Sequence, residues 1–259
     1  MEFIDQLNRT VKFTKTPSRI VSLVPSQTEL LVDLGLLSNI VGITKFCVHP
    51  VDLRKEKTIV GGTKKVDFNK IKSLKPDIII CNKEENTEEM ILQLEQIAPV
   101  WISDISTISE SIEMINRLGE IFEVTEMSSR IIYEIKKEWD DFKVQVKSIP
   151  SKKVLYLIWK DPYMAAGKDT FINDLLHLNN FENVITAKNS RYPEVGPKTL
   201  KKAEIVLLSS EPYPFKKKHI TELKKEIDAE LKLVDGEYFS WYGSRLIKAF
   251  DYFKSLHSK

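Results

Sequence analysis

The chain has 259 residues, of which 42% are hydrophobic and 29% are charged. This hydrophobic content excludes a disordered chain, and the length suffices for one large core or two smaller ones. Lysine and arginine number 39 against 37 aspartates and glutamates, so the net charge is only +2. A nucleic-acid-binding domain usually carries a concentrated basic excess, whereas the lysine clusters here alternate with acidic residues along expected helices, so we predict no nucleic-acid partner.

Short β-branched runs alternate with amphipathic segments through residues 1–105, a pattern typical of an α/β lobe with a mainly parallel sheet. The sequence Ser26-Gln-Thr-Glu29 matches a capping box, so we expect Ser26 to cap a helix and Glu29 to reach back to it. The expected strands are Arg19–Val24, Ile40–Thr44, Thr58–Val60, Asp77–Cys81 and Val100–Ser103, and the expected helices are Ser26–Gly35, Asp67–Leu74 and Asn86–Ala98.

Residues 106–150 have a different character. Gly119 is the only glycine in this segment, and apolar residues recur at helical spacing, as at Ile131, Ile135 and Trp139. A helix over Thr125–Lys147 would span roughly 34 Å at 1.5 Å per residue, which is about the length of a domain. We therefore predict a helical segment containing one long helix between two lobes.

Residues 151–259 return to alternating strands and helices and are predicted to form a second α/β lobe. The two lobes are also similar to each other in sequence. Arg19–Leu23 is similar to Lys153–Leu157, and Lys72–Cys81 is similar to Leu200–Leu208. This similarity favours a repeat. The expected strands are Lys153–Trp159, Glu204–Ser209 and Leu231–Val234, and the expected helices are Asp169–Leu178, Phe215–Ile227 and Gly243–Leu256.

The N-terminal residues do not indicate export, and the cysteines indicate neither a disulfide framework nor a zinc site. The sequence begins without a basic region followed by an apolar stretch, and no segment reaches the roughly 18 apolar residues of a membrane span. From the sequence as given we expect no export signal, which leaves cytoplasmic residence open. Cys47 and Cys81 lack CxxC spacing, so a disulfide framework or a zinc site of the usual spacing is not expected.

Several motifs, in a consistent order from about residue 17 to residue 256, carry a resemblance to a known family. The sequence RIVSLVPSQTEL at 19–30 is similar to the opening of the periplasmic binding proteins for cobalamin and ferric siderophores, which are solute-binding components of ABC transporters. The similarity continues through VGIT (41–44), VGGT (60–63), IKSLKPDIII (71–80), AGKDT (166–170), NFEN (180–183), SRYP (190–193) and SWYGSR (240–245).

This resemblance implies a class III solute-binding protein, in which two α/β lobes are joined by a single long backbone helix and the ligand lies in the cleft between the lobes. It implies a monomer that carries a metal chelate, either cobalamin or another corrinoid or a ferric siderophore, to ABC transporter permease subunits. Periplasmic or cell-surface residence follows from the same resemblance. The metal stays inside its chelator, so no intrinsic cofactor and no catalysis are expected.

Loops that follow the expected strands supply the candidate ligand-binding residues. Aromatic side chains offer flat contact area to a macrocycle, and lysine or arginine can hold its carboxylate or amide groups. The candidates are Phe46, Cys47, His49, Thr63, Lys64, Asn82 and Lys83 in the first lobe, and Trp159, Tyr163, Met164, Arg191, Tyr192, Trp241, Tyr242 and Arg245 in the second.

Cys47 and His49 allow four interpretations. They could share a soft metal ion, or His49 could be an axial ligand of a corrinoid cobalt or haem iron. They could also be an ordinary loop histidine beside a buried cysteine. A catalytic Cys–His pair is disfavoured, because the sequence shows no well-placed third group or oxyanion helix. The tryptophans that flank the corrinoid in cobalamin-binding members are replaced here by Thr63, Asn82 and Glu194. A ferric siderophore, haem or a different corrinoid therefore stays open beside cobalamin.

In the resembling proteins a surface glutamate on each lobe contacts arginines of the permease, and the positional matches here are Glu88 and Glu211.

Two other functions compete with transport. A cytoplasmic metal- or corrinoid-handling protein could reuse the fold for storage or delivery. An α/β enzyme is opposed by the absence of a Gly-x-Gly-x-x-Gly turn, a P-loop and a Gly-x-Ser-x-Gly elbow.

Overall fold

The fold is taken from a computed structural model that describes residues 1–186 and 190–257. The contacts divide the chain into two compact units. Unit 1 comprises Met1–Asp104, Ser109–Ile135 and Tyr242–Arg245, and unit 2 comprises Ile105–Ile108, Lys136–Trp241 and Leu246–Lys259. Over the described ranges, no helix combines the length and the apolar character that a membrane crossing needs.

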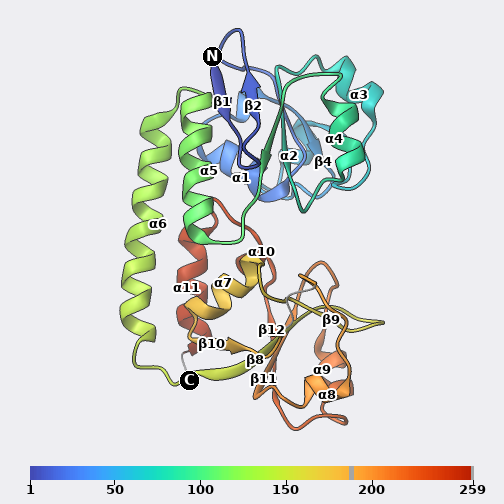
Figure 1. The fold of residues 1–259 in the computed structure, drawn as a ribbon, viewed down its shortest axis with the longest axis vertical. Coiled ribbons are helices and arrows are strands. Elements are labelled where there is room, and N and C mark those ends of the chain that lie inside the picture. Colours follow the sequence, from blue (N-terminus) through green and yellow to red (C-terminus); the bar gives the residue numbers. More distant parts are fainter. Residues whose placement is uncertain (187–189, 258–259) are drawn as a thin grey trace. The chain divides into compact units, whose positions relative to one another are not determined.

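Unit 1, whose strands are coloured blue to green in Figure 1, contains a five-stranded parallel sheet in the order β5-β4-β3-β6-β7. The strands at its centre are buried along their whole length, as near-continuous apolar runs require. The strands are β3 (Ile20–Ser22), β4 (Ile40–Thr44), β5 (Thr58–Gly61), β6 (Ile78–Asn82) and β7 (Val100–Ser103), with a separate antiparallel pair of β1 (Glu2–Ile4) and β2 (Thr10–Lys12). The helices before α5 are α1 (Pro25–Asp33), α2 (Leu53–Glu56), α3 (Phe68–Ser73) and α4 (Glu88–Leu94), with a 3₁₀ turn at Leu37–Asn39.

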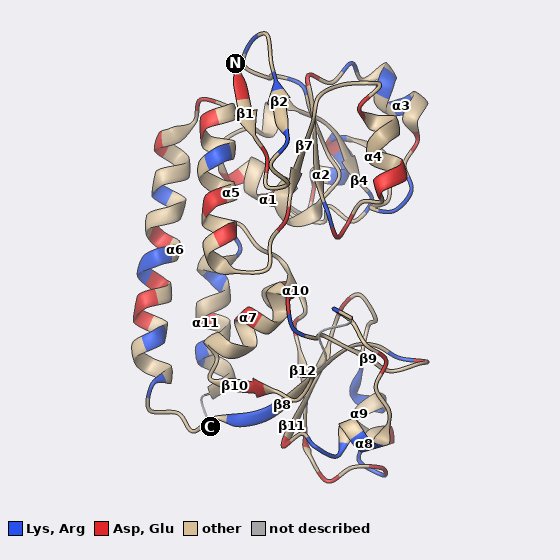
Figure 2. Cartoon of the chain, in the orientation of Figure 1, with Lys and Arg blue, Asp and Glu red and all other residues tan. Residues whose placement is uncertain are grey.

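Helices α5 (Ile108–Ile121) and α6 (Thr125–Val146) form the predicted helical segment. Gly119 of α5 faces Ser128 of α6 so closely that a Cβ atom at this position would collide with the serine side chain, so only glycine allows this approach. Helix α6 has 22 residues, of which those up to Ile135 belong to unit 1 and those from Lys136 belong to unit 2. Its charged residues alternate in sign (Figure 2), as a solvated face requires.

Unit 2 contains a second parallel sheet in the order β10-β8-β11-β12, with β9 antiparallel to β8. Its apolar core packs Leu155 and Leu157 of β8 against Val206 and Leu208 of β11. The strands are β8 (Lys152–Trp159), β9 (Met164–Ala165), β10 (Phe181–Asn183), β11 (Ile205–Ser209) and β12 (Glu230–Val234). The helices are α7 (Phe171–Leu178), α8 (Pro197–Leu200), α9 (Lys217–Leu223), α10 (Glu237–Ser240) and α11 (Leu246–His257).

The sequence similarity between the two lobes is matched by a similarity in strand pairing. The central pair of unit 1 is β3–β6 and that of unit 2 is β8–β11, and in both units the second strand is preceded by an acidic residue. The Asp77 carboxylate accepts hydrogen bonds from the Ser18 amide and hydroxyl, both at 2.9 Å. The Glu204 carboxylate accepts one from the Lys153 amide at 2.7 Å. Each carboxylate therefore ties the start of its strand to the start of the neighbouring strand.

One local expectation was wrong. Helix α1 begins at Pro25 with Val24 as its N-cap, and no side chain caps it, so Ser26 and Glu29 do not form a capping box. Proline at the first helical position supplies the correct φ and lacks the N–H that a cap would have to satisfy. The Glu29 carboxylate instead binds Arg245. Among the described residues, the short elements that were not predicted are β1, β2, β9, β10, α2, α8, α10 and the 3₁₀ turn at Leu37–Asn39.

Candidate functional site

The parallel strands of each sheet end at one edge, which we call the carboxyl edge of unit 1 or of unit 2. The loops that follow the strands gather at this edge, and ligands of open α/β sheets bind there. Nearly all the predicted ligand-binding residues lie on these loops or at the strand ends. Each edge is described within its own unit.

At the carboxyl edge of unit 1, the loop after β4 exposes one aromatic side chain and buries the neighbouring thiol. Phe46 is 49% exposed, and the Lys45 ammonium lies 5.0 Å from the centroid of its ring. The Cys47 Sγ atom is fully buried, 3.2 Å from the Thr28 hydroxyl and 3.3 Å from the Thr44 hydroxyl. Burial raises the pKa of the Cys47 thiol.

These contacts bear on the hypothesis that Cys47 and His49 share a soft metal. A thiol of raised pKa is protonated at neutral pH, whereas the thiolate is the metal-binding form. His49 is half-buried, and the described ranges contain no group of three or more His, Cys, Asp or Glu residues placed to hold a metal ion. Among the described residues, the structure therefore places no further metal ligand beside Cys47 and His49, and the shared metal site stays a prediction.

Two predicted lysines lie exposed on the rim of this edge. The Lys83 ammonium pairs with the Asp104 carboxylate at 2.6 Å, and the Lys64 ammonium donates to the backbone carbonyl of Glu84. Both side chains remain accessible to solvent, so both could also reach an acidic group on a ligand. Thr63, also predicted, is half-buried on the loop that follows β5.

Below the rim lies a buried polar network that the sequence analysis found only in part. The Gln27 amide donates to the Ser103 hydroxyl and, at 3.2 Å, to the Tyr242 hydroxyl. The predicted residue Asn82 is buried, and its amide donates to the Ser103 hydroxyl at 3.0 Å. Gln27 and Ser103 were missed, although both are polar residues next to apolar runs. Burial also raises the pKa of Glu85, a half-exposed carboxyl beside the network that was likewise missed.

The segment Tyr242–Arg245 lies in unit 1, although the sequence analysis assigned it to the second lobe. The Arg245 guanidinium forms two hydrogen bonds with the Glu29 carboxylate, at 2.8 and 2.9 Å, and the two residues are only 6% and 8% exposed. Gly243 has φ +95, which favours glycine, and its amide donates to the Ser111 hydroxyl at 2.9 Å. These contacts explain the assignment of the segment to unit 1.

At the carboxyl edge of unit 2, Trp159 at the end of β8 is 41% exposed. Its ring meets the Tyr213 ring edge to face, with the centroids 5.6 Å apart. Of the other predicted residues in this unit, Tyr163, Met164, Arg191 and Tyr192 are half-buried, whereas Trp241 is buried. The exposed indole of Trp159 is therefore the largest apolar contact surface that a ligand would meet among these residues.

The two glutamates matched to permease docking have different environments. Glu88 is exposed as the first residue of α4, where a carboxylate complements the helix dipole. Glu211 is half-buried, and its carboxylate accepts hydrogen bonds from the Ser240 hydroxyl at 2.6 Å and from the Trp241 indole at 3.0 Å. Glu211 therefore also holds the loop after β11 to the segment around α10.

His219 is a buried titratable group behind Trp159 that was missed. Its Nδ1 atom accepts a hydrogen bond from the Lys216 amide at 2.9 Å, and its ring packs against Tyr213 and Phe215. Burial and the positive charge of Lys160 lower the pKa of His219, with smaller lowering contributions from Lys218 and Lys216, whereas Glu222 opposes them. The neutral ring is therefore the form that fits this site.

We expect the free energy of unfolding to decrease as the pH falls below about 6.5, because the unfolded chain then binds a proton that folded His219 resists. Chemical denaturation at about pH 7.5 and about pH 5 measures this loss. The variant H219Q should lose less stability over the same interval, and His257, whose pKa burial also lowers, accounts for part of the remaining slope. The exposed His177 provides a matched control, since H177Q should behave like the wild type. A pH dependence in H219Q equal to that of the wild type would show that His219 is not responsible.

Residues 20–232 match the family described as periplasmic binding protein. The chain belongs to the periplasmic binding protein family. An uncharacterized ABC transporter substrate-binding lipoprotein of Bacillus subtilis (strain 168), YvrC, is 30% identical over 200 residues, which cover 74% of this chain. The match spans 61% of that relative's length.

Solved structures agree with the fold of this periplasmic binding protein. The periplasmic vitamin B12 binding protein of Vibrio cholerae superposes with a TM-score of 0.80 and 18% identity, covering 94% of this chain and 99% of that one. The periplasmic heme-binding protein of Roseiflexus sp. RS-1 in its apo form gives a TM-score of 0.79 and 18% identity, covering 93% and 98%. The predicted fold, two α/β lobes with mainly parallel sheets and one long helix, is confirmed.

Proposed function

We propose that this periplasmic binding protein binds a metal chelate at the carboxyl edges of its two sheets and delivers it to an ABC-type importer. The observation that carries the proposal is an exposed aromatic ring at each edge, Phe46 in unit 1 and Trp159 in unit 2. Aromatic rings contribute large apolar contact areas with little loss of side-chain entropy, and they suit a flat macrocycle. The exposed Lys64 and Lys83 at the edge of unit 1 would hold acidic groups on the chelator.

Three kinds of chelate fit this proposal: a corrinoid such as cobalamin, a ferric siderophore and haem. Proteins of similar fold are named for vitamin B12 and for heme, which supports the first and third. Each presents an organic surface around its metal, so the protein needs to supply only apolar contacts and a few polar groups. His49, half-buried and three residues after Phe46 in the sequence, is the residue that would reach a metal with an open axial position.

Membrane permease subunits would be the protein partners, with Glu88 and Glu211 as the docking residues and a monomer as the active form. A relative named as a lipoprotein and neighbours named as periplasmic support a location outside the cytoplasmic membrane. They favour transport over a cytoplasmic storage role.

Isothermal titration calorimetry of the purified protein against cyanocobalamin, a ferric siderophore and haem tests the proposal. We expect saturable one-to-one binding of one of the three with micromolar or tighter affinity. Phe46→Ala and Trp159→Ala should each weaken that binding about tenfold, as truncation of an exposed aromatic contact does. Leu92→Ala, an exposed position on α4, is the control that should leave binding unchanged. Absence of heat from all three ligands would exclude the chelate function as stated here.

A further inference from the structure

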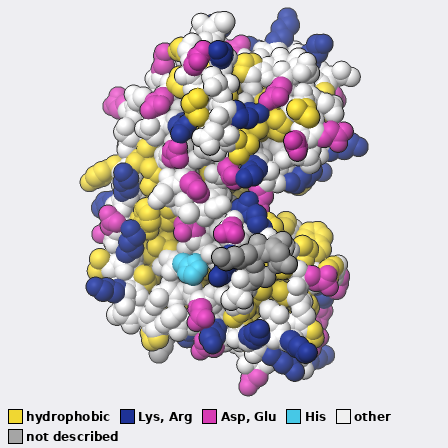
Figure 3. All heavy atoms as spheres, in the orientation of Figure 1, with side chains coloured by type: hydrophobic (Ala, Val, Ile, Leu, Met, Phe, Trp, Pro, Cys, Tyr) yellow, Lys and Arg dark blue, Asp and Glu magenta, His cyan; other side chains and the backbone are white. Residues whose placement is uncertain are grey.

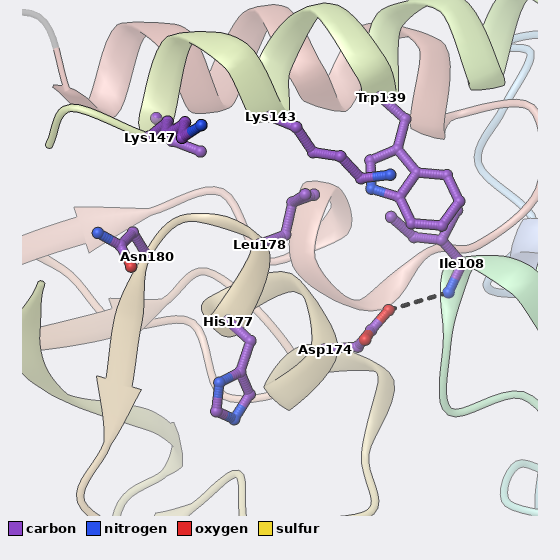
Figure 4. Close-up of a pocket in the computed structure, with 9 residues that line it drawn as sticks. Ile108, Trp139, Lys143, Lys147, Asp174, His177, Leu178 and Asn180 are labelled. Carbon is purple, nitrogen blue, oxygen red and sulfur yellow. Dashed lines mark hydrogen bonds between the residues drawn. The ribbon is translucent and has the colours of Figure 1, made fainter.

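Unit 2 has a groove that lies apart from its carboxyl edge. It runs between the second half of α6 and α7, encloses about 460 Å³ and is open to solvent (Figure 4). This volume is within the range of small-molecule sites. None of its lining residues belongs to the loops that follow β8, β11 or β12, so it is separate from the site proposed for the chelate. We call it the α6–α7 groove; its apolar lining comprises Ile108, Trp139, Val146 and Leu178.

The apolar part of the groove has an aromatic wall and an aliphatic floor. Trp139 comes from α6 and is half-buried, and Leu178 points from α7 toward α6 (Figure 4). Ile108 and Val146 are buried beside them. In the space-filling view, apolar side chains are visible between α6 and α7 next to lysines and a histidine (Figure 3). An apolar surface left open to water in this way favours a ligand with an apolar body.

The polar groups around this apolar strip are mainly hydrogen-bond donors and cations. The Lys143 ammonium lies 3.7 Å from the centroid of the Trp139 ring, and its contact with Asp140 is long, at 3.4 Å. Among the described residues, the side chains of Lys147 and His177 have no hydrogen-bond or ion-pair partner.

The acidic group that lines the groove is already engaged. The Asp174 carboxylate accepts a hydrogen bond from the Ile108 amide at 3.0 Å (Figure 4), so part of its charge is satisfied within the protein. Lys143 and Lys147 outnumber this single carboxylate among the lining residues, so the net charge of the groove is positive. A ligand that matches both the charge and the apolar strip has an apolar body and an anionic group.

We propose that the α6–α7 groove binds a small amphipathic carboxylate. Its apolar body covers Trp139 and Leu178, and its carboxylate pairs with Lys143 and Lys147. This is a second binding site on the chain, and it does not depend on whether the carboxyl edges bind a chelate.

Titration of ¹⁵N-labelled protein with decanoate, followed by NMR, tests the proposal. The Trp139 indole signal is identified by its absence in Trp139→Phe. We expect a saturable shift of this signal and of the Leu178 amide with decanoate, and a much smaller one with decyltrimethylammonium, which has the same tail and the opposite charge. The double variant K143E/K147E should weaken decanoate binding by about tenfold or more, because two attractive charges become repulsive.

The control is K136E/K137E, which makes the same charge change on exposed positions of the same helix that do not line the groove. It should bind decanoate with the affinity of the wild type, and the circular dichroism of both double variants should match that of the wild type. Equal shifts with the anionic and cationic probes would mean that the groove only adsorbs apolar tails. That result, wild-type affinity in K143E/K147E, or an unshifted Trp139 signal would each overturn the proposal.

Discussion

Replacement of Arg245 by alanine is expected to lower the free energy of unfolding of unit 1 by about 3–5 kcal/mol. The guanidinium and the Glu29 carboxylate are both nearly inaccessible to water and form two hydrogen bonds, at 2.8 and 2.9 Å. Removing one partner leaves the other as a buried charge without compensation, which costs more than the pair contributes as a whole. Urea denaturation followed by circular dichroism measures the loss.

Two further variants separate the ion pair from simple loss of packing. The double variant E29L/R245M removes both charges while keeping apolar volume, and it should be much closer to wild type than R245A. Lys12→Ala breaks the exposed pair with Glu2 in the same unit and should change stability by no more than about 0.5 kcal/mol. If R245A were as mild as K12A, the buried pair would not be a main determinant of stability. An R245A protein that folds but loses ligand binding would support the prediction that Arg245 contacts the ligand.

Replacement of Phe142 by alanine is expected to destabilise unit 2 by about 3–5 kcal/mol, the usual cost of deleting a buried phenylalanine ring. Phe142 lies in the second half of α6, and its ring packs against Phe250 and Phe253 of α11, with centroids 6.1 and 6.0 Å away. These rings cannot collapse fully into the space left by the deletion, so a cavity term adds to the lost burial. Thermal and urea denaturation should both show the loss.

The matched control is Tyr133→Ala on the same helix, because that side chain is 68% exposed. It should change stability by no more than about 0.5 kcal/mol. A similar loss in both variants would mean that the packing of Phe142 does not determine the effect, because the high helix propensity of alanine would favour the helix in both. Phe142→Leu, which keeps most of the volume, should lie between the wild type and F142A.

Patterns that repeat over many residues predicted the fold well. Helix α6 was placed at Thr125–Lys147 and is found at Thr125–Val146 because its apolar positions recur over six turns. All five strands of the unit 1 sheet, and β8, β11 and β12 of the unit 2 sheet, were predicted, most of them because they are apolar runs bounded by loop residues. Elements of two to four residues, such as β9 and α10, are too short to show a period, and tertiary contacts determine them.

The candidate site was predicted less completely, because no local sequence pattern determines which side chains of a loop are exposed. Phe46 and Cys47 are adjacent in sequence, yet one is exposed and the other is fully buried. The partner of Glu29 is 216 residues away in sequence, so the local capping-box pattern favoured the wrong structure. Gln27 was missed for the same reason, since its contacts with Ser103 and Tyr242 are both long-range.

The way in which the chain divides between the units has a consequence for its synthesis. Unit 1 includes Tyr242–Arg245, which contribute the buried partner of Glu29 and the hydroxyl that contacts Gln27. A ribosome makes these residues only after the part of unit 2 that runs from Lys136 to Trp241, so unit 1 cannot complete its core until that part has been translated. Many multidomain proteins finish their first domain early in translation. Here unit 1 waits for residues that follow most of unit 2, and in the meantime the Glu29 carboxylate, which is buried in the folded chain, can be reached by a chaperone or a protease.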